Sequence, residues 1–208
     1  MAKTSTANTY RSTFGVNMAR PQQYDETQVL ESATDAFWKR GYAATSMAEL
    51  IQATGLKSGS IYGGFGSKQG LFEASIDHYA AQGLKDIDLR LSSGEDYLES
   101  IRSCFAWLIE SSLDCKPDGC FLVNALIELA PHDTVIRQTL KDHIGNVEQA
   151  FTRALTAAKS AGQLQDDADI AAMAKKIMVS LWGIRVIQRT GLSVEEVETF
   201  KHYYCNIV

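Results

Sequence analysis

The sequence has 208 residues, of which 45% are hydrophobic and 22% are charged, and its net charge is −5 at pH 7. This composition is ordinary for a globular protein and excludes disordered and collagen-like classes. No apolar stretch approaches the roughly 20 residues that a membrane-spanning helix needs. The segment before Tyr24 is polar where a signal peptide would be apolar. We therefore expect a cytoplasmic protein with no membrane partner.

Charge is distributed unevenly along the chain. Residues 1–72 contain seven Lys or Arg against five Asp or Glu, whereas residues 73–208 contain thirteen against twenty. Cations that displace counterions from phosphates supply the non-specific affinity for nucleic acids. A mildly basic first part with an acidic second part is typical of a DNA-binding unit joined to a separate regulatory unit.

The sequence contains four cysteines without C-x-x-C spacing, at Cys104, Cys115, Cys120 and Cys205. Reduced thiols in a reducing compartment are the expectation for such a pattern. The four histidines are scattered, and the spacing Glu128-x-x-x-His132 is interrupted by Pro131. We expect no metal site and no cofactor.

Apolar residues recur at spacings of three and four along most of the chain, and this period predicts an all-helical protein. A small polar residue three positions before Glu or Gln predicts a helix start. In such a capping box the side chain of each residue accepts a hydrogen bond from the backbone N–H of the other. These boxes are Asp25 with Gln28, Ser46 with Glu49, Ser92 with Glu95, and Ser193 with Glu196. They predict helices at 26–40, 47–54, 93–112 and 194–206. Periodicity adds helices at 58–64, 68–90, 119–129, 133–160 and 167–189.

Two short predicted helices are separated by the tight turn Gly55-Leu56-Lys57. This arrangement predicts a helix-turn-helix, in which the second helix lies in the major groove of DNA. Leu56 and Ile61 are expected to pack against Leu50. The positions left facing outward, Ser58, Gly59, Ser60 and Tyr62, are the expected DNA surface.

One ordered motif resembles the TetR/AcrR family of transcriptional regulators: Gly41-Tyr42-x-x-Thr45-Ser46, Gly55-Leu56-x-x-Gly59-Ser60-Ile61-Tyr62, Phe65-Gly66-Ser67-Lys68 and Leu71-Phe72. The resemblance implies a three-helix helix-turn-helix domain at residues 25–72 and a helical ligand-binding and dimerisation domain at residues 73–208. Residues 1–24, without periodicity, are expected to form a flexible arm. The resemblance also implies a homodimer on double-stranded operator DNA and no enzymatic activity.

By the same resemblance, Thr45 and Tyr62 correspond to phosphate contacts, and Lys68 to a basic residue that meets the DNA backbone. Phosphate contacts set the register of a protein on DNA rather than the sequence that it reads. The complete set of expected DNA-binding residues is Arg20, Thr45, Ser46, Lys57, Ser58, Gly59, Ser60, Tyr62 and Lys68. The chain departs from the family at Gly63-Gly64, where the family has a bulky residue. Two glycines cost a helix about 2 kcal/mol relative to alanine, so a short or frayed recognition helix is expected.

The second part of the chain has enough apolar surface for a bundle with an internal pocket, a usual location for ligands. The expected lining is Phe105, Leu108, Cys120, Leu122, Leu126, Val147, Phe151, Met178 and Trp182. The alternative for each residue is ordinary core packing. The expected dimer interface is Ile170, Ala174, Ile177, Leu181, Ile184, Val197, Phe200 and Tyr204, and its alternative is packing within one chain.

Cys120 lies in Pro117-Asp-Gly-Cys-Phe-Leu-Val-Asn124, which resembles a motif of the family branch that includes electrophile and oxidant sensors. A helix N-terminus stabilises a thiolate and would make this thiol reactive, although Asp114 and Asp118 oppose that effect. The alternative is a small buried hydrophobic residue.

No arrangement typical of catalysis occurs: there is no Gly-x-Ser-x-Gly elbow, phosphate-binding glycine loop, His-Glu-x-x-His or dinucleotide fingerprint. We expect a repressor released from a palindromic operator by a small-molecule inducer, with the helix that starts near residue 68 as the lever. Control by modification of Cys120 is the alternative, and a helical enzyme or protein-interaction module is a remote one.

Overall fold

The computed structural model describes residues 24–114 and 119–204. Arg20 and the expected arm up to residue 23, Cys115 and Cys205 lie outside these ranges. Within them the chain forms nine α-helices, one short 3-10 helix and no strand, which confirms the all-helical prediction. None of these helices is long and apolar enough to cross a membrane.

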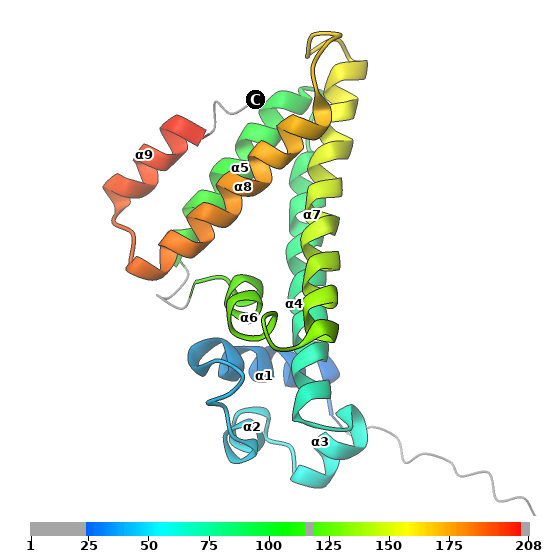
Figure 1. Ribbon diagram of the computed structural model, residues 1–208, viewed down its shortest axis with the longest axis vertical. Helices are drawn as coiled ribbons and strands as arrows, with labels where there is room; N and C mark the ends of the chain where they lie inside the picture. Colours follow the sequence, from blue (N-terminus) through cyan, green and yellow to red (C-terminus); the bar gives the residue numbers. More distant parts are fainter. Residues whose placement is uncertain (1–23, 115–118, 205–208) are drawn as a thin grey trace, which may run out of the picture.

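The helices fall into two groups joined by α4 (Lys68–Leu91). The head comprises α1 (Glu26–Arg40), α2 (Met47–Thr54) and α3 (Ser58–Phe65) at one end of α4 (Figure 1). The body comprises α5 (Tyr97–Asp114), α6 (Phe121–Leu129), α7 (Thr134–Ser160), α8 (Ile170–Ile187), the 3-10 helix η1 (Gln188–Thr190) and α9 (Val194–Tyr204). The two longest helices, α4 and α7, lie side by side, and α6 lies between the head and the rest of the body (Figure 1).

Two of the predicted capping boxes form as expected. The backbone N–H of Ser46 donates to Glu49 Oε2 at 2.7 Å, and the Glu49 N–H donates to Ser46 Oγ at 3.2 Å. Ser193 and Glu196 make the same reciprocal pair at 2.8 and 3.2 Å. Each box satisfies backbone donors that a helix start leaves without intrahelical partners, so α2 and α9 begin where the sequence predicts.

The box at Ser92 does not form, and the prediction of a helix from residue 93 is wrong. Ser92 instead ends α4, because its hydroxyl donates to the Asp88 carbonyl at 2.8 Å and its N–H to the same oxygen at 3.1 Å. Asp96 caps the next helix by accepting the Glu99 N–H at 3.0 Å. Helix α5 therefore starts at Tyr97, four residues later than predicted.

The buried side chains form two hydrophobic clusters. One lies within the body between α4, α5, α7, α8 and α9. The other fills the head, where Leu50 and Ile61 are fully buried as predicted, and continues into α6 through Phe121, Leu122 and Val123. The head thus shares its core with α6 of the body.

Candidate DNA interface and regulatory cavity

The turn between α2 and α3 fixes the direction of the second short helix. Gly55 ends α2 with φ +68°, in the left-handed region that favours glycine. Ile61 on the inner side of α3 is fully buried, and α3 packs against α4. Helix α3 extends through Gly63 and Gly64 to Phe65, so the two glycines do not shorten it.

The outer side of α3 presents the residues that the sequence predicts. Lys57, Ser58 and Gly59 are exposed, Ser60 is half-buried, and Tyr62 is 50% exposed. An added Cβ at Gly63 would meet nothing within 4 Å, so this part of the helix surface is open. The exposed surface of α3 and its N-cap therefore offers one cation, two hydroxyl groups and one phenol, with Ser60 only half-exposed.

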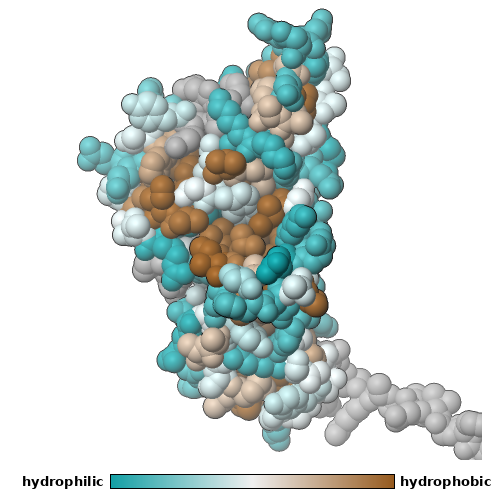
Figure 2. Space-filling model, viewed as in Figure 1, coloured by the Kyte–Doolittle hydropathy of each residue, from teal (hydrophilic) through white to brown (hydrophobic). Residues whose placement is uncertain are grey.

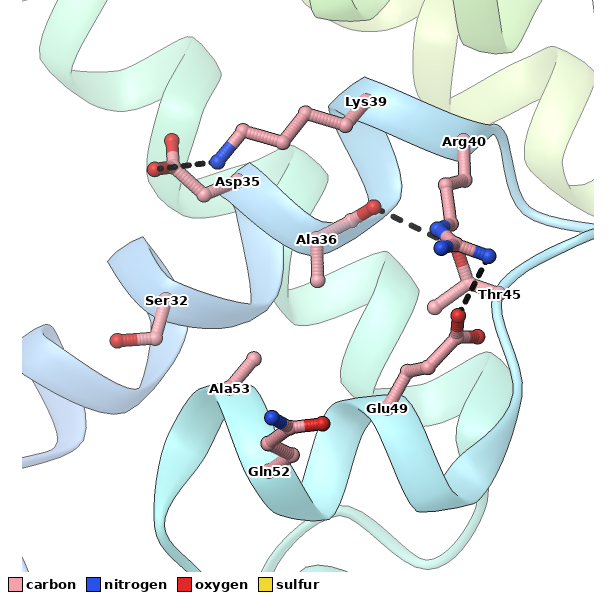
Figure 3. A pocket seen from close by; sticks show the side chains of 9 residues that line it. All are labelled: Ser32, Asp35, Ala36, Lys39, Arg40, Thr45, Glu49, Gln52 and Ala53. Carbon is pink, nitrogen blue, oxygen red and sulfur yellow. Dashed lines mark hydrogen bonds and ion pairs between the residues drawn. The ribbon is translucent and has the colours of Figure 1, made fainter.

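Thr45 does not belong to this exposed face. Its side chain is 1% exposed, and its hydroxyl donates to the Gly41 carbonyl at 2.7 Å. Figure 3 shows Thr45 turned toward α1, with a longer bond of 3.5 Å to the Ala36 carbonyl. In this structure the hydroxyl of Thr45 holds the α1–α2 turn and does not face outward, so its expected phosphate contact stays a prediction.

Two other expected DNA-binding residues have partners within the head. Ser46 is exposed, but its hydroxyl donates to Glu49 Oε2 at 2.9 Å in the capping box. Lys68 Nζ lies 4.4 Å from the centre of the Tyr42 ring, a cation–π distance. The Tyr42 ring lies on one side of the ammonium, whose remaining N–H donors can meet a phosphate.

A polar groove of about 630 Å³ separates α1 from α2 (Figure 3). Arg40 pairs with Glu49 at 2.6 Å, and Lys39 pairs with Asp35 at 3.7 Å. Hydrogen bonds from Ser46, with Arg40 as a smaller contribution, lower the pKa of Glu49, so this carboxylate stays ionised at neutral pH. Two cations of the head, Lys39 and Arg40, are therefore paired with carboxylates. Lys57 and Lys68 are the described cations that flank α3.

A second cavity, of about 310 Å³, lies between α1, α4, α5, α6, α7 and α8. Five of the nine residues that the sequence predicts for a pocket line it: Leu108, Cys120, Leu122, Val147 and Trp182. The other four do not. Phe105, Phe151 and Met178 are buried in the core of the body, and Leu126 packs on the core of the head.

Several lining residues were not predicted, notably Trp38, Tyr79, Trp107 and Arg185. They come from α1, α4, α5 and α8, and no local pattern relates positions so far apart in the chain. Trp38 is the informative one, because it belongs to the first helix of the head. A wall of this cavity is therefore part of the candidate DNA-binding unit.

The two described cysteines differ in their surroundings. Cys120 lines the cavity, and its sulfur lies 3.9 Å from the Tyr79 hydroxyl. Cys104 is fully buried in the core of the body, and burial raises the pKa of its thiol to about 12. Because the thiolate is the reactive form, Cys104 is inert at neutral pH.

Glu128, near the end of α6, connects the body to the head. Its carboxylate accepts the backbone N–H of Tyr42 at 3.0 Å and that of Ala43 at 2.8 Å. Gly41 sits so close that an added Cβ would lie 2.7 Å from Glu128 Oε2. The other end of α6 carries Cys120 at the cavity, so one short helix touches both the cavity and the α1–α2 turn.

Most of the residues predicted for a dimer interface are buried inside the chain. The side chains of Ala174, Ile177, Leu181, Ile184 and Val197 are at most 3% exposed, and Ile170 and Phe200 pack partly against the same core. The apolar stripe of α8 thus meets α5 and α7 of its own chain, which is the alternative given for these residues. The side chain of Tyr204 lies outside the described part of the chain.

The outward face of α8 carries a different apolar row. Val179, Val186 and Ile187 are 73%, 47% and 43% exposed, and Gly183 lies between them at helical spacing. Val194 and Tyr203 of α9 are also exposed. Figure 2 shows hydrophobic surface gathered on the body on this side, whereas the head is mostly hydrophilic or neutral. Exposed apolar patches of this kind mark interaction surfaces.

Comparison with known proteins links both halves of the chain to one family. A family model described as "Bacterial regulatory proteins, tetR family" matches residues 29–75, and one described as "Tetracyclin repressor-like, C-terminal domain" matches residues 98–201. The HTH-type transcriptional repressor ComR of Escherichia coli is 31% identical over 185 residues, which cover 85% of each chain. The HTH-type transcriptional regulator TtgR of Pseudomonas putida is 29% identical over 71% of each chain.

Solved structures agree with this relation. A cysteine mutant of the TetR family transcriptional regulator CifR, complexed with 26-bp double-strand operator DNA, superposes with a TM-score of 0.80 and 26% identity. The match covers 90% of this chain and 98% of that one. The reduced form of NemR from Escherichia coli has a TM-score of 0.71 at 20% identity over 86% of this chain and 95% of that one, a likeness of fold.

Replacing Glu128 with Ala should loosen the α1–α2 turn, because it removes both acceptors from the Tyr42 and Ala43 amides. Hydrogen bonds to charged groups are worth about 1.5–3 kcal/mol each, and partial exposure of Glu128 brings the expected total loss of stability to about 1–3 kcal/mol. Urea unfolding measures this loss, and hydrogen exchange should speed up at residues 42 and 43.

Glu73→Ala is the matched control, since Glu73 also acts electrostatically on Tyr42 of this turn but accepts a hydrogen bond from Gln69 on its own helix. Unchanged exchange at residues 42 and 43 in Glu128→Ala would show that the carboxylate does not hold the turn.

Proposed function

Since the chain belongs to the TetR family of bacterial regulatory proteins and is a DNA-binding transcriptional regulator, we propose that it represses transcription. In this proposal a homodimer binds a palindromic operator through α3 of each protomer, and a small molecule in the cavity of the body releases it. The observation that carries the proposal is the exposed face of α3, which offers Lys57, Ser58, Ser60 and Tyr62 together. A relative that is named a repressor supports repression rather than activation.

The chemistry of α3 fits a contact with the DNA backbone better than extensive base reading. Lys57 is exposed at the start of the helix, and α3 has no side-chain cap there. Backbone N–H groups at an uncapped helix start favour phosphate oxygens. Tyr62 supplies a hydroxyl from the same face, and Lys68 supplies a second cation from the first turn of α4. Ser58 and Ser60 are the side chains left for base edges.

Binding to the DNA upstream of its own gene, measured by fluorescence anisotropy over a salt series, tests the proposal. Each lost Lys–phosphate contact should lower the slope of log K against log salt by about 0.9. We expect this for Lys57→Ala and Lys68→Ala. Tyr62→Phe should weaken binding without changing the slope, because its hydroxyl is neutral.

Lys85→Ala on the exposed surface of α4 in the body is the control and should bind like the wild type. The proposal fails if the wild type shows no salt-dependent binding, or if Lys57→Ala and Lys85→Ala behave alike.

The homodimer is assigned to the outward row of α8 rather than to the stripe that the sequence predicted. Val179, Gly183, Val186 and Ile187 form an apolar strip along one helix face, and a glycine in that strip allows close approach of a second helix. Val194 and Tyr203 of α9 are further exposed apolar residues of the body. A symmetric dimer through this surface would present two copies of α3 to a palindromic site.

Val179→Glu should break this dimer, since a carboxylate without a partner would be buried at the contact. Light scattering coupled to size-exclusion chromatography should show a folded monomer. Val135→Glu is the control, because Val135 is similarly exposed, at 63%, but lies at the start of α7. A dimer that persists in Val179→Glu would place the interface elsewhere.

Release by a ligand requires that occupation of the cavity changes the head, since a ligand acts only through its different affinity for two states. Three connections are available. Trp38 of α1 is itself a cavity wall, α4 runs from the cavity to the head, and α6 joins the cavity to the α1–α2 turn through Glu128. The sequence predicts that α4 transmits the effect of the ligand to the head, and α1 and α6 offer two further connections.

Thiol modification at Cys120 is the second candidate for control. The observation that favours it is the position of Cys120 in the cavity wall beside the Tyr79 hydroxyl. An electrophile or peroxide that enters the cavity would meet this sulfur. A modified thiol would occupy cavity volume and push on the first turn of α6.

In a chain carrying Cys115→Ser and Cys205→Ser, hydrogen peroxide should oxidise Cys120 and spare Cys104, because the raised pKa of Cys104 leaves it almost without thiolate. Peptide mass spectrometry measures the site, and anisotropy measures the accompanying loss of DNA affinity. Cys120→Ser should keep its affinity. Equal loss in Cys120→Ser would exclude this mechanism.

A further inference from the structure

The cavity of the body has an unusual aromatic wall. The chain contains three tryptophans, and all of them, Trp38, Trp107 and Trp182, line this one cavity together with Tyr79. They come from four different helices, α1, α5, α8 and α4. Large flat rings around a volume of about 310 Å³ favour a ligand that is itself flat and aromatic, since such a ligand can stack on several faces.

One polar atom in this wall has no partner among the described residues. The Nε1–H of Trp182 is buried and lacks a hydrogen-bond acceptor there. A buried donor without an acceptor is costly, and pairing it recovers that cost. A ligand with an acceptor at this position would bind more tightly than one of the same shape without it.

Among the described residues that line the cavity, one is a cation and one is an anion. Arg185 donates to Ser111 Oγ and Gln188 Oε1, both at 3.1 Å, and these bonds hold its guanidinium in the wall. Asp86 also lines the cavity, but it is exposed. A guanidinium inside an aromatic enclosure repels a cationic ligand and attracts a carbonyl, ether, ring-nitrogen or phenolate acceptor.

We propose that the cavity binds a planar aromatic molecule that carries a hydrogen-bond acceptor, with the indole N–H of Trp182 as its donor. This inference rests on the proposed function, in which the cavity is the inducer site. Because Trp38 belongs to α1, the ligand touches the DNA-binding head directly. Stacking on Trp38 is then the contact through which the ligand acts on the head.

Quinoline and naphthalene are a matched pair of probes, since they have the same shape and differ by one ring nitrogen that accepts a hydrogen bond. Isothermal titration should show that the wild type binds quinoline about tenfold more tightly than naphthalene, the equivalent of about 1.4 kcal/mol. Trp182→Phe keeps an aromatic wall and removes the donor. In this variant the two probes should bind within about twofold of each other.

Trp107→Phe is the control, because it changes an indole of the same cavity that is not the unpaired donor. It should keep the preference for quinoline. Continued binding of naphthalene to Trp182→Phe shows that this variant retains its cavity.

The proposal is overturned if neither probe binds at millimolar concentration, if the wild type binds both equally, or if Trp182→Phe keeps the preference. It is also overturned if benzyltrimethylammonium, a cationic probe of aromatic enclosures, binds more tightly than quinoline.

Operator binding of the same variants is measured separately. If the wild type binds DNA but shows no preference for quinoline, the ligand class is rejected and the proposed function stands. Absence of DNA binding with the preference intact rejects the proposed function alone.

Discussion

Phe121, the first residue of α6, packs its ring edge-to-face against Phe72 at 5.6 Å and against Tyr79 at 5.7 Å, and also lies against Trp38 at 6.1 Å between ring centres. This aromatic contact places the first turn of α6 in the core of the DNA-binding head. Close-packed interiors transmit displacements rather than absorbing them. The proposed effect of a ligand on the head would travel through this shared core, because α1, α4 and α6 meet in it.

The polar contacts of Glu128 reinforce the same coupling from the other end of α6. The carboxylate accepts two backbone N–H groups in the α1–α2 turn, while the hydroxyl of Thr45 closes that turn from inside. The turn is thus fixed by one group from the body and one from the head. Hydrogen bonds from both sides restrict the conformations of this turn. The proposed switch between two distinct head positions requires such restricted elements.

The prediction from sequence succeeded where the determining interactions are local. Gly55 lies in the left-handed conformation that the turn requires, and the boxes at Ser46 and Ser193 start their helices. It failed at Ser92, where a capping sequence was present but the serine hydroxyl bonded back to Asp88. A serine can bond forward as a helix cap or back to a carbonyl four residues earlier, and the local pattern fits both; here Asp96 caps the next helix instead.

Helical periodicity identified the apolar residues of α8 but not their partners. Ile177 and Leu181 were assigned to a dimer and lie in the core of their own chain, while the exposed row of Val179 and Val186 is offset by two positions, on roughly the opposite side of the helix. Two apolar stripes on one helix have the same period, so the pattern alone does not say which one faces the interior. The same limit explains why Phe105 and Phe151 were placed in a pocket that they do not line.

The sequence by itself determined the helical class, the helix-turn-helix with its turn glycine, and the outward positions of α3, because these follow from neighbouring residues and backbone geometry. Only the tertiary structure decided that Trp38, Trp107 and Trp182 meet around one cavity, that Thr45 is buried, and that Glu128 reaches the α1–α2 turn. These contacts join residues from helices far apart in the chain, and their geometry follows from how the helices cross rather than from any pattern within one of them.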